Sequence, residues 1–369
     1  MARPKAAKLL HDEQGRIDLK SLSLPALEVW VQETLGERAF RARQIWKWLW
    51  QKGAPSFDEM TDISKGLRAR LVEHAYVSTL EPERILRSTD GTVKYLWKLE
   101  DGMTIESVLI PDGERTTLCM SSQVGCAMAC TFCLTGDLGL KRHLKPSEIA
   151  NQALQVLQDM REQSPFPEEE RITNLVYMGM GEPLHNFENL CTALEICLDD
   201  NALNYSHRRI TVSTVGLVPK IRELSERLPV NLAISLNATT EETRRGIMPI
   251  TRKYSMEELL ETCRGLDLPT GKRITFEYVM FRDDNDSLED AARILKLLRG
   301  IKAKVNLIPY NENPDRDLRP PPDDRVRAFQ RYLMDRGMNC TVRTTRGQDI
   351  SAACGQLGKA REQATAQGW

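Results

Sequence analysis

Residues 125–133 read Gly125-Cys126-Ala127-Met128-Ala129-Cys130-Thr131-Phe132-Cys133, so that three cysteines are spaced C-x3-C-x2-C. Three thiols on one loop can converge on a compact metal centre, because thiolates are the natural ligands of iron–sulfur clusters. A structural zinc site prefers four closed ligands, and the nearest additional candidates are Cys119 and His143. The spacing therefore favours a cluster with one iron open to a substrate, and it leaves zinc and unliganded buried thiols as alternatives.

The cysteine loop follows a strand-like segment and begins an alternation of strands and helices. The expected strands are Thr116–Ser121, Ile172–Met178, Ile210–Ser213, Val230–Leu236, Ile274–Val279, Val305–Ile308 and Cys340–Thr344. The expected helices between them are Ser147–Met160, Phe187–Leu198, Val218–Arg227, Ser255–Leu266, Leu288–Leu298 and Asp323–Asp335. Repeated βα units with apolar strands predict an α/β fold, a parallel sheet wrapped as a full or partial barrel. In such barrels the active site lies at the C-terminal ends of the strands.

Polar residues follow several of these strands. The second strand ends in Gly179-Met180-Gly181-Glu182-Pro183, where glycines let a ligand approach the backbone and a carboxylate can accept from an ammonium group. Other polar strand ends are Ser213, the segment Ser235-Leu236-Asn237, and Asn311. Taken alone, a Gly-Glu-Pro turn also has a purely structural explanation, and each Ser or Asn could simply cap a helix.

Two further regions precede the barrel. Residues 1–82 are expected to form a helical domain, with helices at Pro25–Leu35, Arg38–Lys52 and Lys65–His74. Residues 83–111 alternate, and Asp-Gly pairs separate the alternating segments, which predicts a small antiparallel β meander. The barrel is then expected over residues 112–348, followed by a C-terminal tail over residues 349–369.

The second expected helix, Arg38–Lys52, interleaves four aromatic side chains with five basic ones. This pattern is typical both of a surface that stacks on nucleic-acid bases and of an amphipathic helix that buries its tryptophans. Residues 1–52 contain ten Lys and Arg against six Asp and Glu, although the whole chain has a net charge of −1. A nucleic-acid partner would therefore be met by a local basic surface, because the chain as a whole is not a polycation. Further candidate phosphate contacts, with solvated surface as the alternative, are the arginines near expected strand or helix ends: Arg208, Arg209, Arg244, Arg245, Arg343 and Arg346.

Composition restricts the other function classes. The 369 residues include nine cysteines, and a chain of this length needs no disulfides for stability, so metal or redox chemistry is favoured. No apolar segment approaches the ~18 residues that a membrane-spanning helix requires, and the first residues contain no apolar signal-peptide segment. We therefore expect a cytoplasmic location and no membrane partner.

The cysteine loop, with Phe132 before its last cysteine, resembles the signature of the radical S-adenosylmethionine (SAM) superfamily. The resemblance implies that Cys126, Cys130 and Cys133 hold a [4Fe-4S] cluster whose open iron chelates SAM. It also implies that SAM is contacted at the strand ends, by Gly181, Glu182, Ser213, Ser235, Leu236, Asn237 and Asn311.

A narrower resemblance extends from Glu106 to Cys354. The segments 119–126, 178–184, 235–238, 306–311 and 346–357 are similar to the RlmN/Cfr family of radical SAM RNA methyltransferases. The resemblance implies methylation of adenine C2 in 23S rRNA and in some tRNAs, with two SAM molecules per turnover. It also implies an electron donor such as flavodoxin or ferredoxin, and an N-terminal domain that helps to bind RNA.

The same resemblance assigns catalytic roles to three residues. Cys354 accepts a methyl group and forms a transient disulfide with Cys119, while Glu106 is a proton acceptor whose division of labour with Cys119 stays open. Without the family resemblance, Cys119 and Cys354 would be interpreted as inert thiols. Two other functions remain as alternatives: C8 methylation on the same scaffold, and a non-catalytic iron–sulfur protein that binds RNA or carries electrons.

Overall fold

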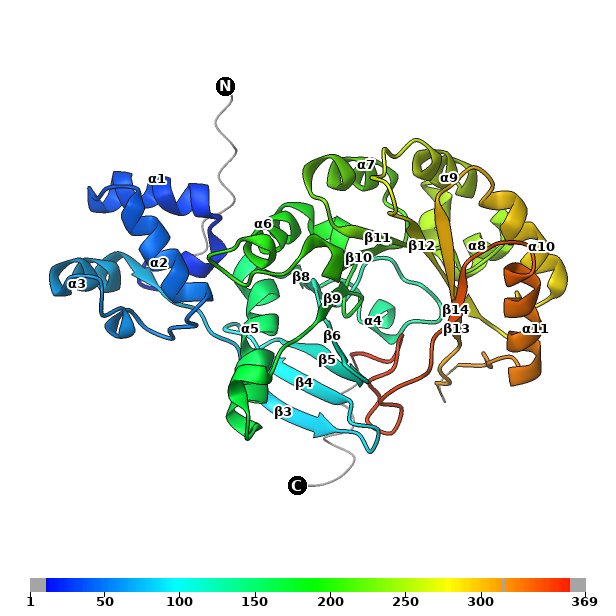
Figure 1. The fold of residues 1–369 in the computed structure, drawn as a ribbon, viewed down its shortest axis with the longest axis horizontal. Coiled ribbons are helices and arrows are strands. Elements are labelled where there is room, and N and C mark those ends of the chain that lie inside the picture. Colours follow the sequence, from blue (N-terminus) through cyan, green and yellow to red (C-terminus); the bar gives the residue numbers. More distant parts are fainter. Residues whose placement is uncertain (1–10, 314–315, 359–369) are drawn as a thin grey trace. The chain divides into compact units, whose positions relative to one another are not determined.

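The computed structural model describes residues 11–313 and 316–358, which form two compact units (Figure 1). The first unit combines the chain up to Glu81 with Leu144–Arg171 and Glu188–Ser206. The second unit contains Pro82–His143, Ile172–Phe187 and the chain from His207 onward. The outer parts of the expected N-terminal domain and C-terminal tail, residues 1–10 and 359–369, lie outside the described residues.

The first unit is mainly helical. Its elements are β1 (Ile17–Asp18), α1 (Leu24–Leu35), α2 (Phe40–Trp50), α3 (Lys65–His74), β2 (Ala75–Tyr76), α5 (Pro146–Gln163) and most of α6 (Phe187–Leu198). Ser23 caps the start of α1 by accepting from the Ala26 N–H, and Gly36 ends the helix in the left-handed region. The two short strands pair in parallel. The three helices expected before residue 82 are thus present, whereas α5 and α6, expected among the barrel helices, belong to this unit.

The basic and aromatic helix α2 is amphipathic. Trp46 and Trp50 are fully buried, while Arg43 and Lys47 on the same helix are exposed. Trp48 is half-buried, and its indole N–H donates to Asp62 (2.5 Å). Two of the three tryptophans therefore pack in the core, so stacking on bases is not open to them in this conformation.

The second unit is built on a ten-stranded sheet. Its strand order is β14-β13-β12-β11-β10-β9-β6-β5-β4-β3. The bounds are β3 (Glu81–Arg87), β4 (Val93–Lys98), β5 (Thr104–Asp112), β6 (Arg115–Cys119), β9 (Asn174–Tyr177), β10 (Ile210–Thr214), β11 (Asn231–Ser235), β12 (Ile274–Met280), β13 (Ala303–Pro309) and β14 (Cys340–Val342). All neighbouring pairs from β6 to β14 are parallel. Among the described strands β14 and β3 form two separate edges, which fits a partial barrel.

The meander is part of this sheet. Strands β4 and β5 pair antiparallel, and β5 pairs antiparallel with β6, which is also the first strand of the parallel half. A short pair, β7 (Gln123–Val124) with β8 (Arg142–His143), brackets the cysteine loop. The expected meander and the expected barrel therefore share one continuous sheet.

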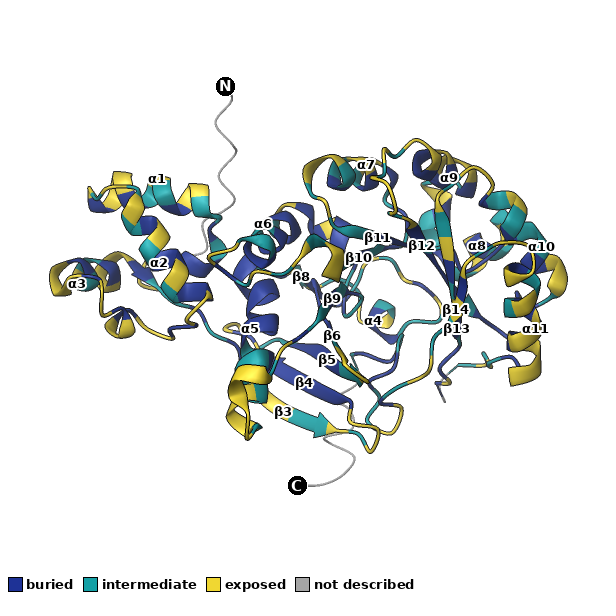
Figure 2. Cartoon of the chain, in the orientation of Figure 1, coloured by how far each residue is buried: buried dark blue, intermediate teal, exposed yellow. Residues whose placement is uncertain are grey.

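The longer helices of the second unit lie along the outside of the parallel strands (Figure 1). They are α7 (Val218–Arg227), α9 (Met256–Arg264), α10 (Leu288–Leu297) and α11 (Asp323–Met334), whereas the short helices α4 (Leu134–Asp137) and α8 (Glu241–Ile247) contact the cysteine loop. Helix α7 packs with α9, and α10 packs with α11. Figure 2 shows buried strands behind helices whose outer faces are exposed. Helix α8 was not expected from the sequence, because its seven residues show too little periodicity.

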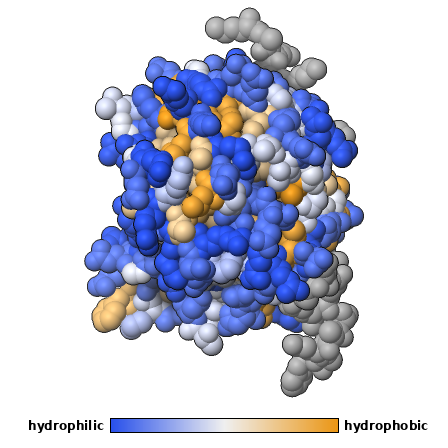
Figure 3. Space-filling view, turned by 90° about the vertical axis from the view of Figure 1, so that its right-hand side faces the viewer, coloured by the Kyte–Doolittle hydropathy of each residue, from blue (hydrophilic) through white to orange (hydrophobic). Residues whose placement is uncertain are grey.

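Hydrophilic residues cover most of the face shown in Figure 3. Within the described part of the chain, no helix has both the length and the apolar character needed to cross a membrane.

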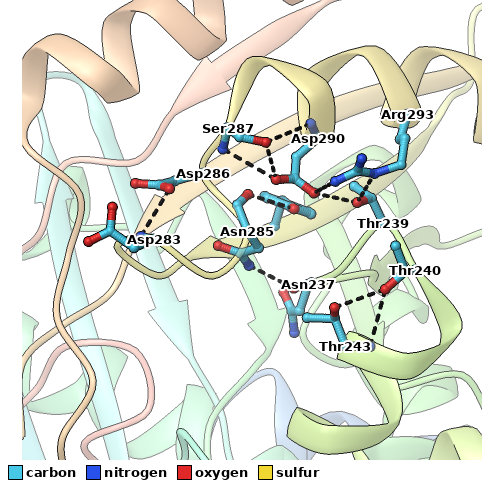
Figure 4. A network of polar contacts seen from close by, with 11 residues as sticks. Asn237, Thr239, Thr240, Thr243, Asp283, Asn285, Asp286, Ser287, Asp290 and Arg293 are labelled. Atoms are coloured by element: carbon cyan, nitrogen blue, oxygen red, sulfur yellow. Dashed lines mark hydrogen bonds and ion pairs between the residues drawn. The ribbon is translucent and has the colours of Figure 1, made fainter.

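A buried polar network joins the ends of β11 and β12 to the start of α10 (Figure 4). The Asn285 amide donates to the carbonyls of Asn237 and Val279 (both 2.8 Å), and its oxygen accepts from the Phe281 N–H (2.7 Å). Asn237 has a φ of 56°, in the left-handed region, and its side-chain oxygen accepts from the Val279 N–H (2.9 Å). One buried asparagine thus satisfies three backbone groups and fixes the turn that follows β11.

We predict that Asn285→Ala destabilises the protein. The substitution leaves two carbonyls and one N–H without their side-chain partner, and each such buried group costs ~1–3 kcal/mol. The expected loss in the free energy of unfolding is about 2–5 kcal/mol, measured by urea denaturation. The neighbouring exposed Asp284 is a matched control, and Asp284→Ala should change stability by less than about 0.5 kcal/mol. Equal effects of the two substitutions would contradict this role of Asn285.

Candidate active site

The cysteine loop is held in place by backbone hydrogen bonds from two directions. The Cys126 N–H donates to the carbonyl of Gly139 (3.1 Å), beyond helix α4. The Thr131 N–H donates to the carbonyl of Ile247 (3.0 Å), the last residue of α8. The loop is therefore anchored before and after its second cysteine.

The three cysteines line one cavity of about 160 Å³ at the C-terminal ends of the parallel strands. Burial raises the pKa of the Cys126 thiol to about 12, and it raises the pKa of Cys130 further. Such thiols stay protonated near neutral pH unless a metal displaces the proton. This concave set of three soft sulfur donors fits an iron–sulfur cluster.

The zinc alternative has no support from the geometry. Among residues 11–313 and 316–358, no three His, Cys, Asp or Glu side chains are grouped so as to hold a single metal ion. A four-iron cluster makes a different demand, because each of its cysteines binds a separate iron atom.

Glycines keep the end of β9 close to the end of β6. A Cβ atom on Gly179 would lie 2.8 Å from the carbonyl carbon and oxygen of Met120. Gly181 has a φ of 98°, and a Cβ there would lie 2.5 Å from the Cβ of Gln123. Both glycines also line the cavity, so a ligand can approach their backbone closely.

Glu182 is the buried acid of the cavity. Its side chain is 2% exposed and accepts from the backbone N–H groups of Val215 (2.9 Å) and Leu184 (3.1 Å). Burial raises the pKa of Glu182 to about 7, although these hydrogen bonds oppose the shift. An ammonium group beside this carboxylate would favour its ionised form.

The other polar strand ends differ in their access to the cavity. Ser213, Ser235, Asn237 and Asn311 line it, as does the Gly181-Glu182 pair. Leu236 is not among the described lining residues; its side chain is buried, and its N–H donates to the carbonyl of Glu277 (2.9 Å). The structure thus gathers the predicted contacts at one place, except for the Leu236 side chain.

The C-terminal tail brings Cys354 to the cysteine loop. The Leu134 N–H donates to the carbonyl of Gly355 (2.9 Å), and the Asn311 amide donates to the carbonyl of Cys354 (3.0 Å). Cys354 lines the large cavity and also a smaller one of about 50 Å³, which is lined by Cys119 and Cys133 as well. Two thiols 235 positions apart in the sequence therefore face a common space, and neither of these described residues forms a disulfide.

Arg343 is the cation beside these thiols. It lines the smaller cavity together with Cys119 and Cys354. Burial raises the pKa of both thiols, that of Cys119 to about 12, and the Arg343 charge opposes the shift in each. The sequence suggested that Arg343 could contact phosphate. In the structure its positive charge instead interacts with the two thiols and with the Glu277 carboxyl group.

Glu106 lies on β5, buried under the tail. Its carboxylate is 3.5 Å from the equally buried Lys94 ammonium and accepts from the Gly358 N–H (3.1 Å). Glu106 is not one of the described residues that line the two cavities. A proton acceptor role there would require access that the docked tail covers in this conformation.

The structure corrects one more expectation. Arg244 was a candidate phosphate contact, but it is 1% exposed and donates to backbone carbonyls at the ends of β10 and β11. Its neighbour Arg245 is exposed, as the sequence suggested. No sequence signal distinguishes the two arginines, because the helix that carries them was not expected.

Comparisons with known proteins agree with this geometry. Residues 17–77 match the family described as the ribosomal RNA large subunit methyltransferase N-terminal domain, and residues 120–298 match the radical SAM superfamily. The chain is 54% identical over 341 residues to the dual-specificity RNA methyltransferase RlmN 2 of Myxococcus xanthus, covering 92% of this chain and 90% of that protein. It is 53% identical to RlmN of an Anaeromyxobacter species, covering 93% and 91%.

The chain belongs to the RlmN family of radical SAM methyltransferases. A crystal structure of a radical SAM methyltransferase from Sphaerobacter thermophilus is 42% identical, with a TM-score of 0.85 over 92% of this chain and 98% of that one. The partial barrel with a helical N-terminal region, expected from the sequence, is thus confirmed. Membership of the radical SAM superfamily implies SAM and a [4Fe-4S] cluster as the cofactors that the cavity has to accommodate.

We predict that SAM binding depends on the ionisation of Glu182. Because the pKa of Glu182 is raised to about 7, the carboxyl becomes protonated below that pH and loses its attraction for an ammonium group. Equilibrium dialysis of reconstituted protein with labelled SAM should show affinity falling as the pH is lowered through about 7. Glu182→Gln should weaken binding and remove this pH dependence; an unchanged profile would contradict the assignment.

Proposed function

We propose that this chain is a radical SAM methyltransferase that methylates C2 of adenine in 23S rRNA and in some tRNAs. The observation that carries the proposal is the common space shared by Cys119, Cys354 and the loop cysteine Cys133. A simple cluster protein needs no such pair of additional thiols at its loop. The relatives' description as dual-specificity RNA methyltransferases supports RNA as the substrate class.

Adenine C2 explains why such a site is needed. This carbon is electron-poor and does not attack the methyl group of SAM, so a polar methyl transfer has no nucleophile. A radical route avoids this difficulty, provided that a one-carbon unit is first attached to a protein group near the cofactors. Cys354 occupies that position, because it lines the cavity that contains Cys126, Cys130 and Cys133.

In this proposal Cys126, Cys130 and Cys133 hold a [4Fe-4S] cluster, and the strand ends bind SAM. When bound, the cluster supplies an electron that cleaves SAM to a 5′-deoxyadenosyl radical. Glu182 holds the amino group of SAM, and the backbone at Gly181 allows close approach. Two SAM molecules are used per turnover, one as methyl donor and one as radical source.

Cys354 carries the one-carbon unit. As a thiolate, which the Arg343 charge favours, it attacks the methyl carbon of the first SAM, and S-adenosylhomocysteine leaves. The 5′-deoxyadenosyl radical would take a hydrogen atom from the S-methyl group and leave as 5′-deoxyadenosine, and the resulting methylene radical would form a bond to C2. The adduct radical would return one electron to the oxidised cluster, while Cys119 or Glu106 accepts the C2 proton.

Cys119 releases the product. Its thiolate attacks Sγ of Cys354, so that an S–S bond forms while the carbon–sulfur bond to the RNA breaks and the freed carbon takes up a proton. The disulfide is returned to two thiols by two electrons from an external reductant. We propose a flavodoxin or ferredoxin as the electron donor for SAM cleavage, and the cytoplasm as the location where these partners meet.

The decisive test is anaerobic incubation of reconstituted protein with methyl-labelled SAM, a reductant and ribosomal RNA. We expect label first on Cys354 and then in 2-methyladenine, identified by mass spectrometry and chromatographic retention of the digested RNA. Label in 8-methyladenine would favour the C8 alternative. No label on Cys354 or on adenine would refute the proposal.

Replacing Cys119 or Cys354 should stop the methylation of RNA at different steps. We predict that Cys119→Ala accumulates a covalent protein–RNA adduct, because the bond to Cys354 forms but cannot be broken, whereas Cys354→Ala forms neither adduct nor product. Gel electrophoresis with labelled RNA measures the adduct. The buried Cys340 on β14 is the control, and Cys340→Ala should keep turnover. An adduct in the Cys354→Ala protein would show that another group carries the methyl.

A further inference from the structure

Among the described residues, Arg244 is a buried cation that contacts no carboxylate. It is 1% exposed, and within the described residues its guanidinium donates to three carbonyls and one hydroxyl: Val215 O (2.7 Å), Thr251 Oγ1 (2.9 Å), Ser235 O (3.1 Å) and Leu236 O (3.1 Å). Burying a charge is costly unless an opposite charge lies nearby. These neutral acceptors satisfy its hydrogen bonds but bring no negative charge into contact with it.

The carbonyls that Arg244 holds lie at the ends of β10 and β11. Ser235 is the last residue of β11, and Val215 directly follows β10. Both residues line the large cavity. The N–H of Val215 donates to Glu182, while its carbonyl accepts from Arg244, so one residue links the buried acid to the buried cation.

The helix that carries Arg244 also contacts the cysteine loop. The carbonyl of Ile247, at the end of α8, accepts from the Thr131 N–H (3.0 Å), next to Cys130. The next residue in the chain is Met248, and its sulfur lies 3.4 Å from the side-chain amide nitrogen of Asn237. Helix α8 thus connects the loop that would hold the cluster with the strand ends that would hold SAM.

Arg244 stays charged near neutral pH, because burial lowers its pKa only to about 10. Cys130 lies on the loop that α8 anchors through the Thr131–Ile247 hydrogen bond, and a negative charge at Cys130 would oppose this shift. Glu241 opposes it to a smaller extent, and its carboxylate already accepts from the Met256 N–H (2.9 Å) and pairs with Arg245. A thiolate at Cys130 would therefore supply the missing negative charge.

We propose that Arg244 is a positioning residue with two tasks at the active site. Its charge balances the negative charge of the thiolate-bound cluster, and its planar guanidinium fixes the ends of β10 and β11 in the arrangement that receives SAM. This inference rests on the proposed function of the three loop cysteines and the strand ends.

The two tasks predict different effects for two substitutions. Arg244→Met removes the charge and the hydrogen bonds, so reduction of the cluster becomes less favourable and its midpoint potential becomes more negative. Arg244→Lys keeps a charge but cannot reproduce the fork of hydrogen bonds to four residues. We expect the lysine protein to keep a potential near that of the wild type. Both variants should bind SAM at least about tenfold more weakly.

The experiment uses the full chain with its cluster reconstituted anaerobically. The midpoint potential is measured by redox titration followed by electron paramagnetic resonance, and SAM affinity by equilibrium dialysis. The exposed Arg245, adjacent on the same helix and paired with Glu241, is the matched control. Arg245→Ala should leave both quantities unchanged.

The outcomes separate this inference from a purely structural role. If Arg244→Met lowers thermal stability but leaves the potential and the SAM affinity at the wild-type values, the inference is overturned. If the Arg244→Met variant does not fold, the Arg244→Lys variant provides the test. Weaker SAM binding at an unchanged midpoint potential supports the inference, and unchanged SAM binding overturns it. A wild-type chain that binds neither cluster nor SAM would instead refute the proposed function, and the inference with it.

Discussion

The docking of the tail on the cysteine loop is the constraint on which the rest of the site depends. Backbone and side-chain hydrogen bonds hold residues 354–358, from Leu134 and Thr135 on the loop side and from Asn311 on the strand side. Without these bonds Cys354 would be a thiol on a chain end, far in sequence from every other reactive group. With them it lies beside Cys133 and Cys119, where group transfer between cofactor, protein and RNA has a short path.

A second constraint is electrostatic. Burial penalises the charge of several groups in the second unit, among them the acids Glu182 and Glu277 and the arginines Arg244 and Arg343. Burial raises the pKa of each acid, so each is protonated more readily than a carboxyl group in water. A cationic ligand group beside Glu182 would favour its ionised form, so the charge of the site depends on what it binds.

The sequence predicted the parts of this site that depend on local pattern. The spacing of Cys126, Cys130 and Cys133 and the polar strand ends are local features. The alternation of strands and helices predicts a parallel sheet, in which the C-terminal ends of the strands lie together. The burial of Arg244 and the orientation of Arg343 depend on packing between segments distant in sequence. The same reason explains why the seven-residue helix α8 and the continuity of the meander with the barrel sheet were not predicted. Cys354 was found only through family resemblance, since small flanking residues carry no periodic signal.

The proposed chemistry asks Cys354 to meet three partners in turn: SAM, the adenine and Cys119. A rigidly enclosed thiol could meet only one of them, and a freely moving tail would lose the proximity that makes the reactions fast. Cys354 lies at the boundary of the large cavity and the smaller one, so a change of side-chain rotamer redirects its sulfur while the tail backbone keeps its hydrogen bonds. The backbone of the tail therefore holds Cys354 in place, and rotation of its side chain lets the sulfur reach each partner, as a carrier thiol requires.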